Sequence, residues 1–419
     1  MSASALTVAV ALAYVVLAEL SGQLTHEQTD AWSVWLATPL TLGVLLVVAR
    51  ARWAPVLIGA AIGAAAFSWV IEPGRLAWAG GYAAIEVLSA IAGAMAAHQV
   101  AALPLKLERP REVAALFVAA AATALVGGAL GAAWTAVSGS AEAFATFYVW
   151  ALANFVGALL VAPLIVTWAG FRAKRSGGLT MPQFAGGAIA CVLLLASLQV
   201  LFGVNGAERF PGSIGLTLTY PPILFIAVVA LTWGARGATL AAFAGAMVAL
   251  VNTAHGHGPF AAVEAFVGEA NLEVQGYAAV IAVTGLLIAG LSARQRTLWR
   301  EARDWRTRFE AAIGAHRMIA YEWDPASGAF AVSGDTAALV GVPPARIATL
   351  ADWLSRVVTE ERDAMQTAFA LRADGGAMPS LRYRVQRVDG TAVTLVDEAE
   401  AIRDHDGTLH RITGIARAS

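Results

Sequence analysis

Long apolar segments alternate with short polar ones over the first 293 residues of the chain. A helix that crosses a bilayer needs about 20 mostly apolar residues, and the pattern predicts about ten such helices. The boundary between the eighth and the ninth is the weakest, because only the sequence WGARGA separates them, so the count lies between eight and ten. The predicted segments are 4–21, 32–49, 53–71, 76–103, 112–137, 145–169, 183–204, 217–234, 237–255 and 275–293.

The segment that follows, residues 294–316, is polar and has no proline, and its only glycine is Gly314. Apolar residues recur there at intervals of seven, which indicates a continuous helix that pairs with a second copy of the chain. We therefore predict a signalling helix and a homodimer. The positions concerned are Leu291, Leu298, Trp305 and Ala312, with Phe309 beside them.

Residues 317–419 have the pattern of a small α+β domain. Apolar and polar residues alternate on both sides of a turn at 325–328, which predicts two strands. A helical region follows, and then three strands joined at Asp389-Gly390 and Asp406-Gly407, which are typical hairpin-turn pairs. The expected sheet has five antiparallel strands.

Composition supports this division into a membrane part and a soluble part. The chain is 58% hydrophobic and 14% charged, whereas soluble proteins have about 25% charged residues. Residues 1–293 contain 11 basic and 12 acidic residues, but the much shorter segment 294–419 contains 17 of each. The N-terminus has no basic region before its apolar segment, so we expect a retained first helix and no cleaved signal peptide.

The charges of the loops predict the orientation in the membrane. Cytoplasmic loops collect Lys and Arg. With ten helices and a cytoplasmic N-terminus, the cytoplasmic loops contain nine basic residues and the opposite loops two. This predicts a multi-pass protein of the bacterial inner membrane, in contact with the lipid bilayer, with both termini in the cytoplasm.

A few polar residues within or beside the apolar segments are the candidate ligand-binding or sensing residues, because ionisable and polar groups are unfavourable in lipid. Each could instead have a structural role: a buried ion pair for Glu86, hydrogen bonds between helices for the asparagines, and a turn for the histidines. Two histidines two positions apart could also contribute to a metal site, but we predict none. The candidates are Glu86, Asn154, Asn252, His255 and His257.

Charge and cysteine content exclude several other functions. The net charge of −1 gives no indication of a nucleic-acid partner. Cys191 is the only cysteine, so no disulfide can form within one chain and no cysteine-based zinc site can be built.

The first 293 residues resemble a known family. The sequences NFVGALLVAPLIVTW and LTWGARGATLAAFAGAMVALVNTAHGHGPF are similar to the membrane-associated sensor domain of the first type, MASE. The resemblance implies an integral-membrane input domain of bacterial histidine kinases or cyclic di-GMP enzymes. Two departures concern Trp35 and Pro39, which LAT separates, and Asn154, where the family commonly has an acidic residue. A charge-based role at Asn154 is therefore not expected.

The soluble domain, residues 317–419, resembles a PAS domain of the third subfamily through RYRVQRVDGTAVTL and its final strand. Such domains bind small ligands or relay signals. A flavin adduct would require a cysteine, which is absent there, and His316, His405 and His410 lie outside the predicted helical region where a haem ligand is expected. We predict no cofactor and leave the PAS ligand unknown.

Together these features predict a sensory protein of the bacterial inner membrane. Its domains are a membrane domain at 1–293, a signalling helix at 294–316 and a cytoplasmic PAS domain at 317–419. The sequence contains no phosphate loop, no GGDEF-like motif and no kinase signature, so we predict that the chain is not itself an enzyme. We expect it to control a kinase or cyclic di-GMP module, in a longer chain or in a separate partner. The alternatives are a secondary transporter and a scaffold that detects another membrane protein.

Overall fold

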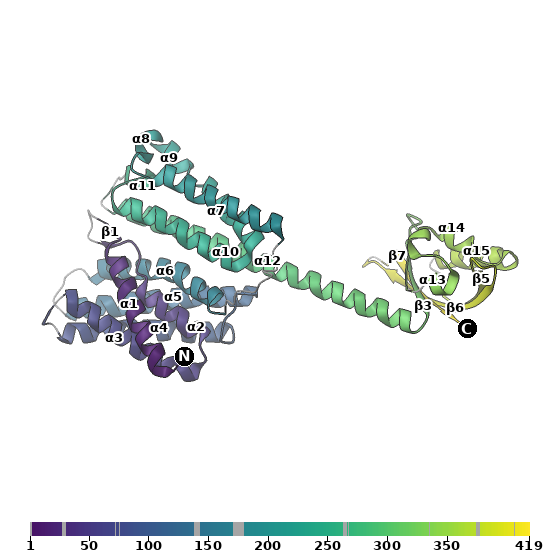
Figure 1. The fold of residues 1–419 in the computed structure, drawn as a ribbon, viewed down its shortest axis with the longest axis horizontal. Coiled ribbons are helices and arrows are strands. Elements are labelled where there is room, and N and C mark those ends of the chain that lie inside the picture. Colours follow the sequence, from purple (N-terminus) through teal and green to yellow (C-terminus); the bar gives the residue numbers. More distant parts are fainter. Residues whose placement is uncertain are drawn as a thin grey trace. The chain divides into compact units, whose positions relative to one another are not determined.

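The computed structural model contains two compact units, Met1–Arg296 and Thr297–Ser419. Each is described by itself below (Figure 1). The residues that the structure describes are 2–26, 31–71, 73–74, 76–137, 143–170, 180–262, 266, 268–334, 336–373, 378–405 and 407–419.

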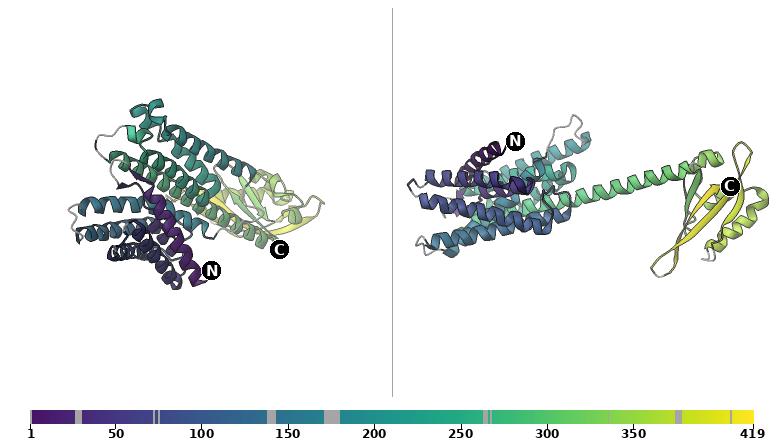
Figure 2. Two further views of the ribbon diagram at one scale, coloured as in Figure 1. Left: turned by 60° about the vertical axis from the view of Figure 1, so that its left-hand side comes forward. Right: turned by 90° about the horizontal axis from the view of Figure 1, so that it is seen from below.

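The first unit is a bundle of apolar helices, which the two further views in Figure 2 show packed side by side. Its main helices are α1 (Ala3–Gly22), α2 (Ala37–Val47), α3 (Trp53–Ile71), α4 (Leu76–Val100), α5 (Pro110–Val137), α6 (Ala143–Trp168), α7 (Met181–Phe202), α10 (Pro221–Ala254) and α12 (Glu269–Ala315). The short elements between them are β1 (Thr25–His26), β2 (Ala31–Trp32), η1 (Arg50–Arg52), α8 (Gly206–Arg209), α9 (Ser213–Thr217) and α11 (Pro259–Ala262).

Eight helices of the described residues are long and apolar enough to cross a membrane, where the sequence predicted about ten. The first difference concerns the predicted segment 32–49. Only its 11-residue part α2 is helical, which spans about 16 Å at 1.5 Å per residue and is too short for a bilayer core of about 30 Å. Residues before α2 leave the helical path because their backbone amides bind elsewhere: Trp35 N donates to Ala153 O and Leu36 N to Ser21 Oγ.

The second difference is one of counting, because α10 contains both the predicted eighth and the predicted ninth helix, and the chain reverses between them at Gly234. A Cβ on Gly285 of α12 would lie 3.2 Å from Ile226 Cγ2 and 3.6 Å from Ala238 O. In a straight helix Ile226 and Ala238 would be about 18 Å apart. Because both lie beside Gly285, the chain reverses between them. Gly234 makes the reversal with φ 68° and ψ −157°, a conformation that is open almost only to glycine.

Small residues make the close packing of the bundle possible, as is typical of helices in lipid. The buried face of α5 consists largely of alanine and glycine, for example Ala115, Ala119, Gly127 and Gly131. A Cβ on Gly131 would lie within 2.6 Å of the Trp150 ring of α6.

The second unit contains the predicted five-stranded antiparallel sheet, and its strand order is β4-β3-β7-β6-β5. Gly328 and Gly390, in the predicted turns, have φ of 74° and 83°; Asp406, of the last predicted turn, lies outside the described residues. The elements are β3 (Met318–Trp323), β4 (Phe330–Gly334), α13 (Thr336–Val340), η2 (Pro344–Arg346), α14 (Leu350–Leu354), α15 (Thr359–Ala373), β5 (Leu381–Gln386), β6 (Ala392–Arg403) and β7 (Leu409–Ala418).

One face of this sheet packs against the helices α13, α14 and α15. Trp353 of α14 and Phe369 of α15 are fully buried there, and they lie against Tyr321, Tyr383 and other large side chains of the strands. Aromatic rings therefore fill the interior between the sheet and the helices.

Candidate functional site

The membrane domain contains a cavity of about 210 Å³ that reaches the buried Glu86. Its walls come from four helices, α1, α3, α4 and α6, and from the segment before α2. Ile71 and Trp78 lie where α3 and α4 are joined, and Glu86 lies ten positions into α4, about 15 Å along the helix. The lining residues are Tyr14, Trp32, Trp35, Ala64, Phe67, Ser68, Ile71, Trp78, Tyr82, Glu86, Trp150, Ala153 and Asn154.

Glu86 is held by neutral hydrogen-bond donors. Its carboxylate accepts a bond from the Thr38 hydroxyl and lies 3.4 Å from the Trp35 Nε1 donor. The Tyr14 hydroxyl also bonds to it. Glu86 is 5% exposed, and the described residues that line the cavity include no Lys, Arg or His. A buried carboxylate without a cationic partner is unfavourable, so this group is a candidate for binding a ligand.

Aromatic rings form a continuous wall around the space in front of Glu86. The rings of Trp32 and Trp35 stack with centroids 4.7 Å apart, and the Phe67 ring meets Trp35 edge-on at 5.9 Å. On the other side, Tyr82 stacks on Trp150 at 5.4 Å. Trp32 lies 6.2 Å from Trp150 and so joins the two groups.

Asn154 adds a polar atom to the same cavity. Its Nδ2 donates to the Trp150 carbonyl of its own helix at 3.0 Å, which fixes which end of the amide is the donor. Its Oδ1 is buried and has no hydrogen-bond partner. A buried acceptor without a donor is unfavourable by about 1–3 kcal/mol, so a ligand that donates a hydrogen bond would satisfy it.

The segment that supplies Trp32 and Trp35 also binds α12. Gln275 of α12 is 2% exposed, and its Nε2 donates to Ser33 O at 2.9 Å. Ser33 lies between Trp32 and Trp35 of the cavity wall. A direct hydrogen bond therefore joins this wall to α12.

The other sequence-predicted site residues do not lie at this cavity. Asn252 Nδ2 donates to Val248 O at 2.7 Å, and the His255 ring nitrogen Nδ1 lies 2.7 Å from Val251 O. The backbone amide of His257 donates to Asn252 O. These bonds end α10, and within the described residues no group of three His, Cys, Asp or Glu could hold a metal ion. The structure thus places Glu86 and Asn154 at one cavity, and the other three candidates do not line it.

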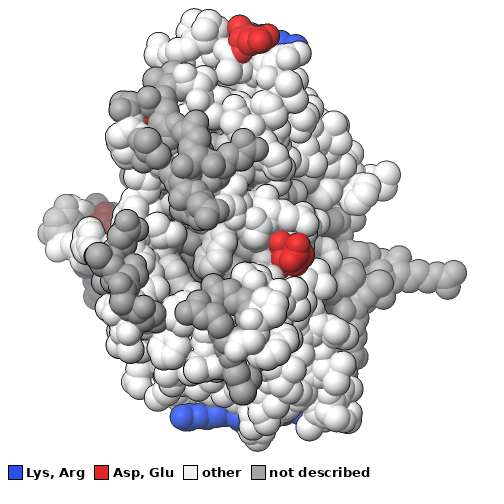
Figure 3. All heavy atoms as spheres, turned by 90° about the vertical axis from the view of Figure 1, so that its left-hand side faces the viewer, with Lys and Arg blue, Asp and Glu red and all other residues white. Residues whose placement is uncertain are grey.

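Few charged groups cover the end of the membrane domain that carries β1. Figure 3 views this face from the left of Figure 1, and the acidic and basic side chains that it draws form isolated spots among uncharged residues. The described part of this face therefore offers no continuous charged patch.

The predicted signalling residues lie on α12, which is continuous from Glu269 to Ala315. Leu291, Leu298 and Trp305 are 62%, 56% and 67% exposed, and Ala312 is also exposed. The rings of Trp305 and Phe309 stack at 5.2 Å. A row of exposed apolar side chains at heptad spacing is what a paired helix requires.

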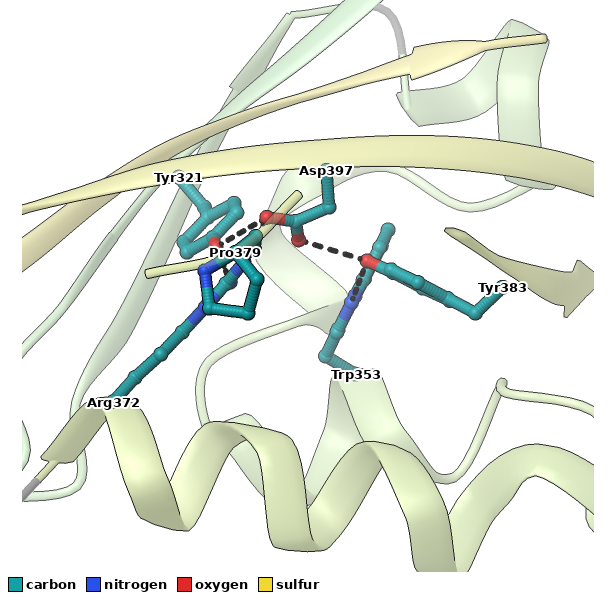
Figure 4. Close-up of polar contacts among 6 residues, drawn as sticks. All are labelled: Tyr321, Trp353, Arg372, Pro379, Tyr383 and Asp397. Carbon is teal, nitrogen blue, oxygen red and sulfur yellow. Dashed lines mark hydrogen bonds and ion pairs between the residues drawn. The ribbon is translucent and has the colours of Figure 1, made fainter. Parts of the chain in front are cut away.

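The soluble unit contains a buried polar network that links its sheet to α14 and α15 (Figure 4). Arg372 Nη1 lies 2.9 Å from Asp397 Oδ1, and both side chains are buried. Tyr321 and Tyr383 each donate a hydroxyl hydrogen bond to Asp397, at 2.9 and 3.1 Å. Trp353 Nε1 donates to the Tyr383 hydroxyl at 3.0 Å. Burial raises the pKa of Asp397, and Arg372 opposes that shift.

Sequence reasoning named Glu86 and Asn154, which both line the cavity, but it missed the aromatic wall. The signal was present, because Trp78, Tyr82 and Glu86 recur at four-residue intervals and so share one face of α4. Tyr14, Trp35 and Trp150 come from distant segments, and a single sequence does not show that they meet.

Comparisons with known proteins agree with this architecture. Family models match residues 6–296, described as MASE1, and residues 330–416, described as PAS fold. A search of curated proteins gives no match.

Two solved structures are similar to part of the chain. The N-terminal domain of a diguanylate cyclase with PAS/PAC sensor from Marinobacter aquaeolei is 22% identical, with 24% of this chain and 94% of that one covered and a TM-score of 0.23. A sensory box histidine kinase/response regulator from Burkholderia thailandensis is 17% identical, with 26% and 83% covered and a TM-score of 0.23. Because the MASE1 match covers more than half of its residues, the chain belongs to the MASE1 family of membrane sensor domains and continues into a PAS fold.

Proposed function

We propose that this chain is a sensory protein of the bacterial inner membrane whose input site is the Glu86 cavity. A ligand in the cavity shifts the segment at residues 32–36, which changes the position of α12. The helix passes this change to a cytoplasmic PAS domain, and that domain controls a histidine kinase or a cyclic di-GMP enzyme. The loop charges support cytoplasmic termini.

The observation that carries the proposal is the hydrogen bond between Gln275 Nε2 and Ser33 O. The acceptor lies in the cavity wall between Trp32 and Trp35, and the donor lies on the helix that continues to Ala315. A ligand shifts an equilibrium only through a difference in its affinity for the two states. A cavity whose wall binds α12 gives a physical basis for such a difference.

The test is a double-mutant cycle in the full chain in lipid nanodiscs. Trp32→Ala changes the cavity wall, and Gln275→Leu removes the link to α12. We expect Trp32→Ala to change hydrogen–deuterium exchange in residues 297–315 when Gln275 is present, and to have no such effect in the Gln275→Leu background. Gln199→Leu, at an exposed position on α7, is the matched control, and alanine at both His255 and His257 should leave the exchange unchanged.

The same effect of Trp32→Ala in both backgrounds would contradict the proposed route. No effect of Trp32→Ala in either background would contradict the cavity as the input site. Substrate flux through sealed vesicles that Glu86→Gln abolishes would instead favour the transporter alternative.

Pairing of α12 in a homodimer is a separate part of the proposal. It rests on the exposed heptad positions Leu291, Leu298 and Trp305. In a Cys191→Ser background, cysteine at Leu298 or Trp305 should form crosslinks between chains in native membranes. Cysteine at Arg303, an exposed position off the heptad row, should give much less. Equal yields at all three positions, or none, would argue against a paired helix.

A further inference from the structure

We propose that the Glu86 cavity binds a compact organic cation, such as an alkylated or protonated amine. This inference rests on the proposed function, because it assumes the same input site and adds the chemical class of its ligand. Three features of the described residues carry it: the carboxyl group of Glu86, the aromatic wall, and the small volume with few oxygen atoms, among them Asn154 Oδ1.

The first feature is an acidic group without a cationic partner. The groups that bond to the Glu86 carboxyl are the Thr38 hydroxyl, the Tyr14 hydroxyl and the Trp35 indole N–H. An indole N–H can only donate, so the carboxyl group accepts the bond from Trp35, and the two hydroxyls can also donate to it. They do not neutralise its charge, and the described lining contains no basic side chain. A cationic ligand would provide the missing charge inside the low-dielectric bundle, where the attraction is strongest.

The second feature is the arrangement of aromatic rings. Trp32, Trp35, Tyr82 and Trp150 lie in one connected group, with neighbouring centroids 4.7–6.2 Å apart. The faces of Trp and Tyr rings attract cations, and cages of such rings bind quaternary ammonium groups. A carboxyl group and aromatic rings that line one cavity are thus matched to an organic cation, whose alkyl groups also pack on the rings.

The third feature is the limited size and the small number of oxygen atoms. The volume of about 210 Å³ corresponds to roughly seven water molecules at ~30 Å³ each. A hard metal ion requires six or more oxygen ligands, and an aromatic wall cannot supply them. A small cation that carries a hydroxyl or N–H group could satisfy Asn154 Oδ1, which lacks a partner.

The test compares choline with its neutral carbon isostere, in which a tert-butyl group replaces the trimethylammonium group. Binding to the full chain in nanodiscs is measured by calorimetric titration, with tetramethylammonium and butylammonium as further probes. We expect at least one cation to bind. For choline, the isostere should bind at least about tenfold more weakly, and Glu86→Gln should weaken the cation by a similar factor and leave the isostere unaffected. Glu19→Gln, at an exposed carboxyl of α1 outside the cavity, should bind like the unmodified protein.

Three results would overturn the inference. They are equal affinity for choline and its isostere, unchanged cation affinity in Glu86→Gln, and no binding of any of the three cations at millimolar concentration. If Glu86→Gln does not fold, which its thermal unfolding midpoint shows, Tyr82→Leu replaces it and should weaken choline more than the isostere. The exchange experiment on Trp32 and Gln275 needs no ligand, so a cavity that is coupled to α12 but does not bind cations would leave the proposed function intact.

Discussion

Removal of Arg372 should strongly destabilise the soluble unit. Its guanidinium is 1% exposed, and Nη1 lies 2.9 Å from the buried Asp397 carboxylate. The same nitrogen donates to the Tyr321 hydroxyl at 2.7 Å, and Nη2 donates to Pro379 O at 3.1 Å. Arg372→Met preserves most of the side-chain volume but leaves Asp397 as a buried charge. Loss of one partner of a buried pair costs about 3–5 kcal/mol.

The loss in the free energy of unfolding is measured by chemical denaturation of the full chain, with hydrogen exchange in β6 and β7 as the readout. Arg382→Met is the matched control, because Arg382 is exposed on β5, and surface changes usually stay within about 0.5 kcal/mol. The double variant Arg372→Met/Asp397→Leu should recover part of the stability, since it leaves no unpaired charge. Two results would refute this account. Arg372→Met could lower the free energy of unfolding by less than about 1 kcal/mol, or the double variant could lose more than the summed losses of Arg372→Met and Asp397→Leu.

The loss should also depend on pH in a defined direction. Burial already raises the pKa of Asp397 in the folded protein, and without Arg372 the pKa rises further. A raised carboxyl pKa means that the folded state takes up protons more readily than the unfolded state, so stability falls as pH rises through the interval between the two values. The deficit of Arg372→Met should therefore be small near pH 3.9, about the ordinary aspartate value, and grow toward neutral pH. A deficit that is constant with pH would contradict the assignment to Asp397.

Two further predictions concern single positions. Gly234→Ala should destabilise the membrane domain by about 1–3 kcal/mol in a denaturant titration, because φ 68° and ψ −157° strain any other residue, while the nearest atom to a new Cβ is 3.8 Å away. Gly80→Ala on α4, which also has open space, should be neutral or stabilising, and equal losses would contradict the reversal. The pKa of Glu361 is lowered by the backbone N–H and guanidinium of Arg384, so the stability it contributes is present above about pH 4.3 and is lost as pH falls through the lowered value. Protection of the Arg384 amide should fall in that range, whereas Glu361→Gln should abolish this pH dependence and Glu360→Gln should retain it.

The pattern of the sequence predicted the features that depend on local composition. Apolar segments of about 20 residues gave most of the helices, since length and hydropathy decide membrane insertion. Alternation and the Asp389-Gly390 pair predicted the strands and a hairpin of the PAS domain, because strand period and turn chemistry are local properties. The continuity of α12 followed in the same way from a segment that has no proline.

Features that depend on contacts between distant residues could not be predicted. The amides of Trp35 and Leu36 bind Ala153 O and Ser21 Oγ, and these tertiary bonds shorten the predicted second helix to α2. The pattern placed the boundary between the eighth and ninth helices at WGARGA, but it did not show that Gly234 alone makes the reversal. His255 and His257 appeared as a pair in the sequence, but their bonds close the end of α10 and leave the cavity to other residues.

Residues 154–157, where the sequence departs from the family pattern, show how the cavity depends on both kinds of information. Asn154 lines the cavity and has a buried Oδ1 without a hydrogen-bond partner, and it lies one residue after the Ala153 carbonyl that binds the Trp35 amide. Three residues later, a Cβ on Gly157 would lie 1.9 Å from Trp35 O, so only glycine lets the backbone at Trp35 reach α6. The short helix α2 begins directly after this contact and places Thr38 on Glu86. A neutral Asn154 is consistent with this geometry, because a second carboxylate beside Glu86 would add like charge to the site, whereas the amide leaves Glu86 as the single acidic group of the described lining.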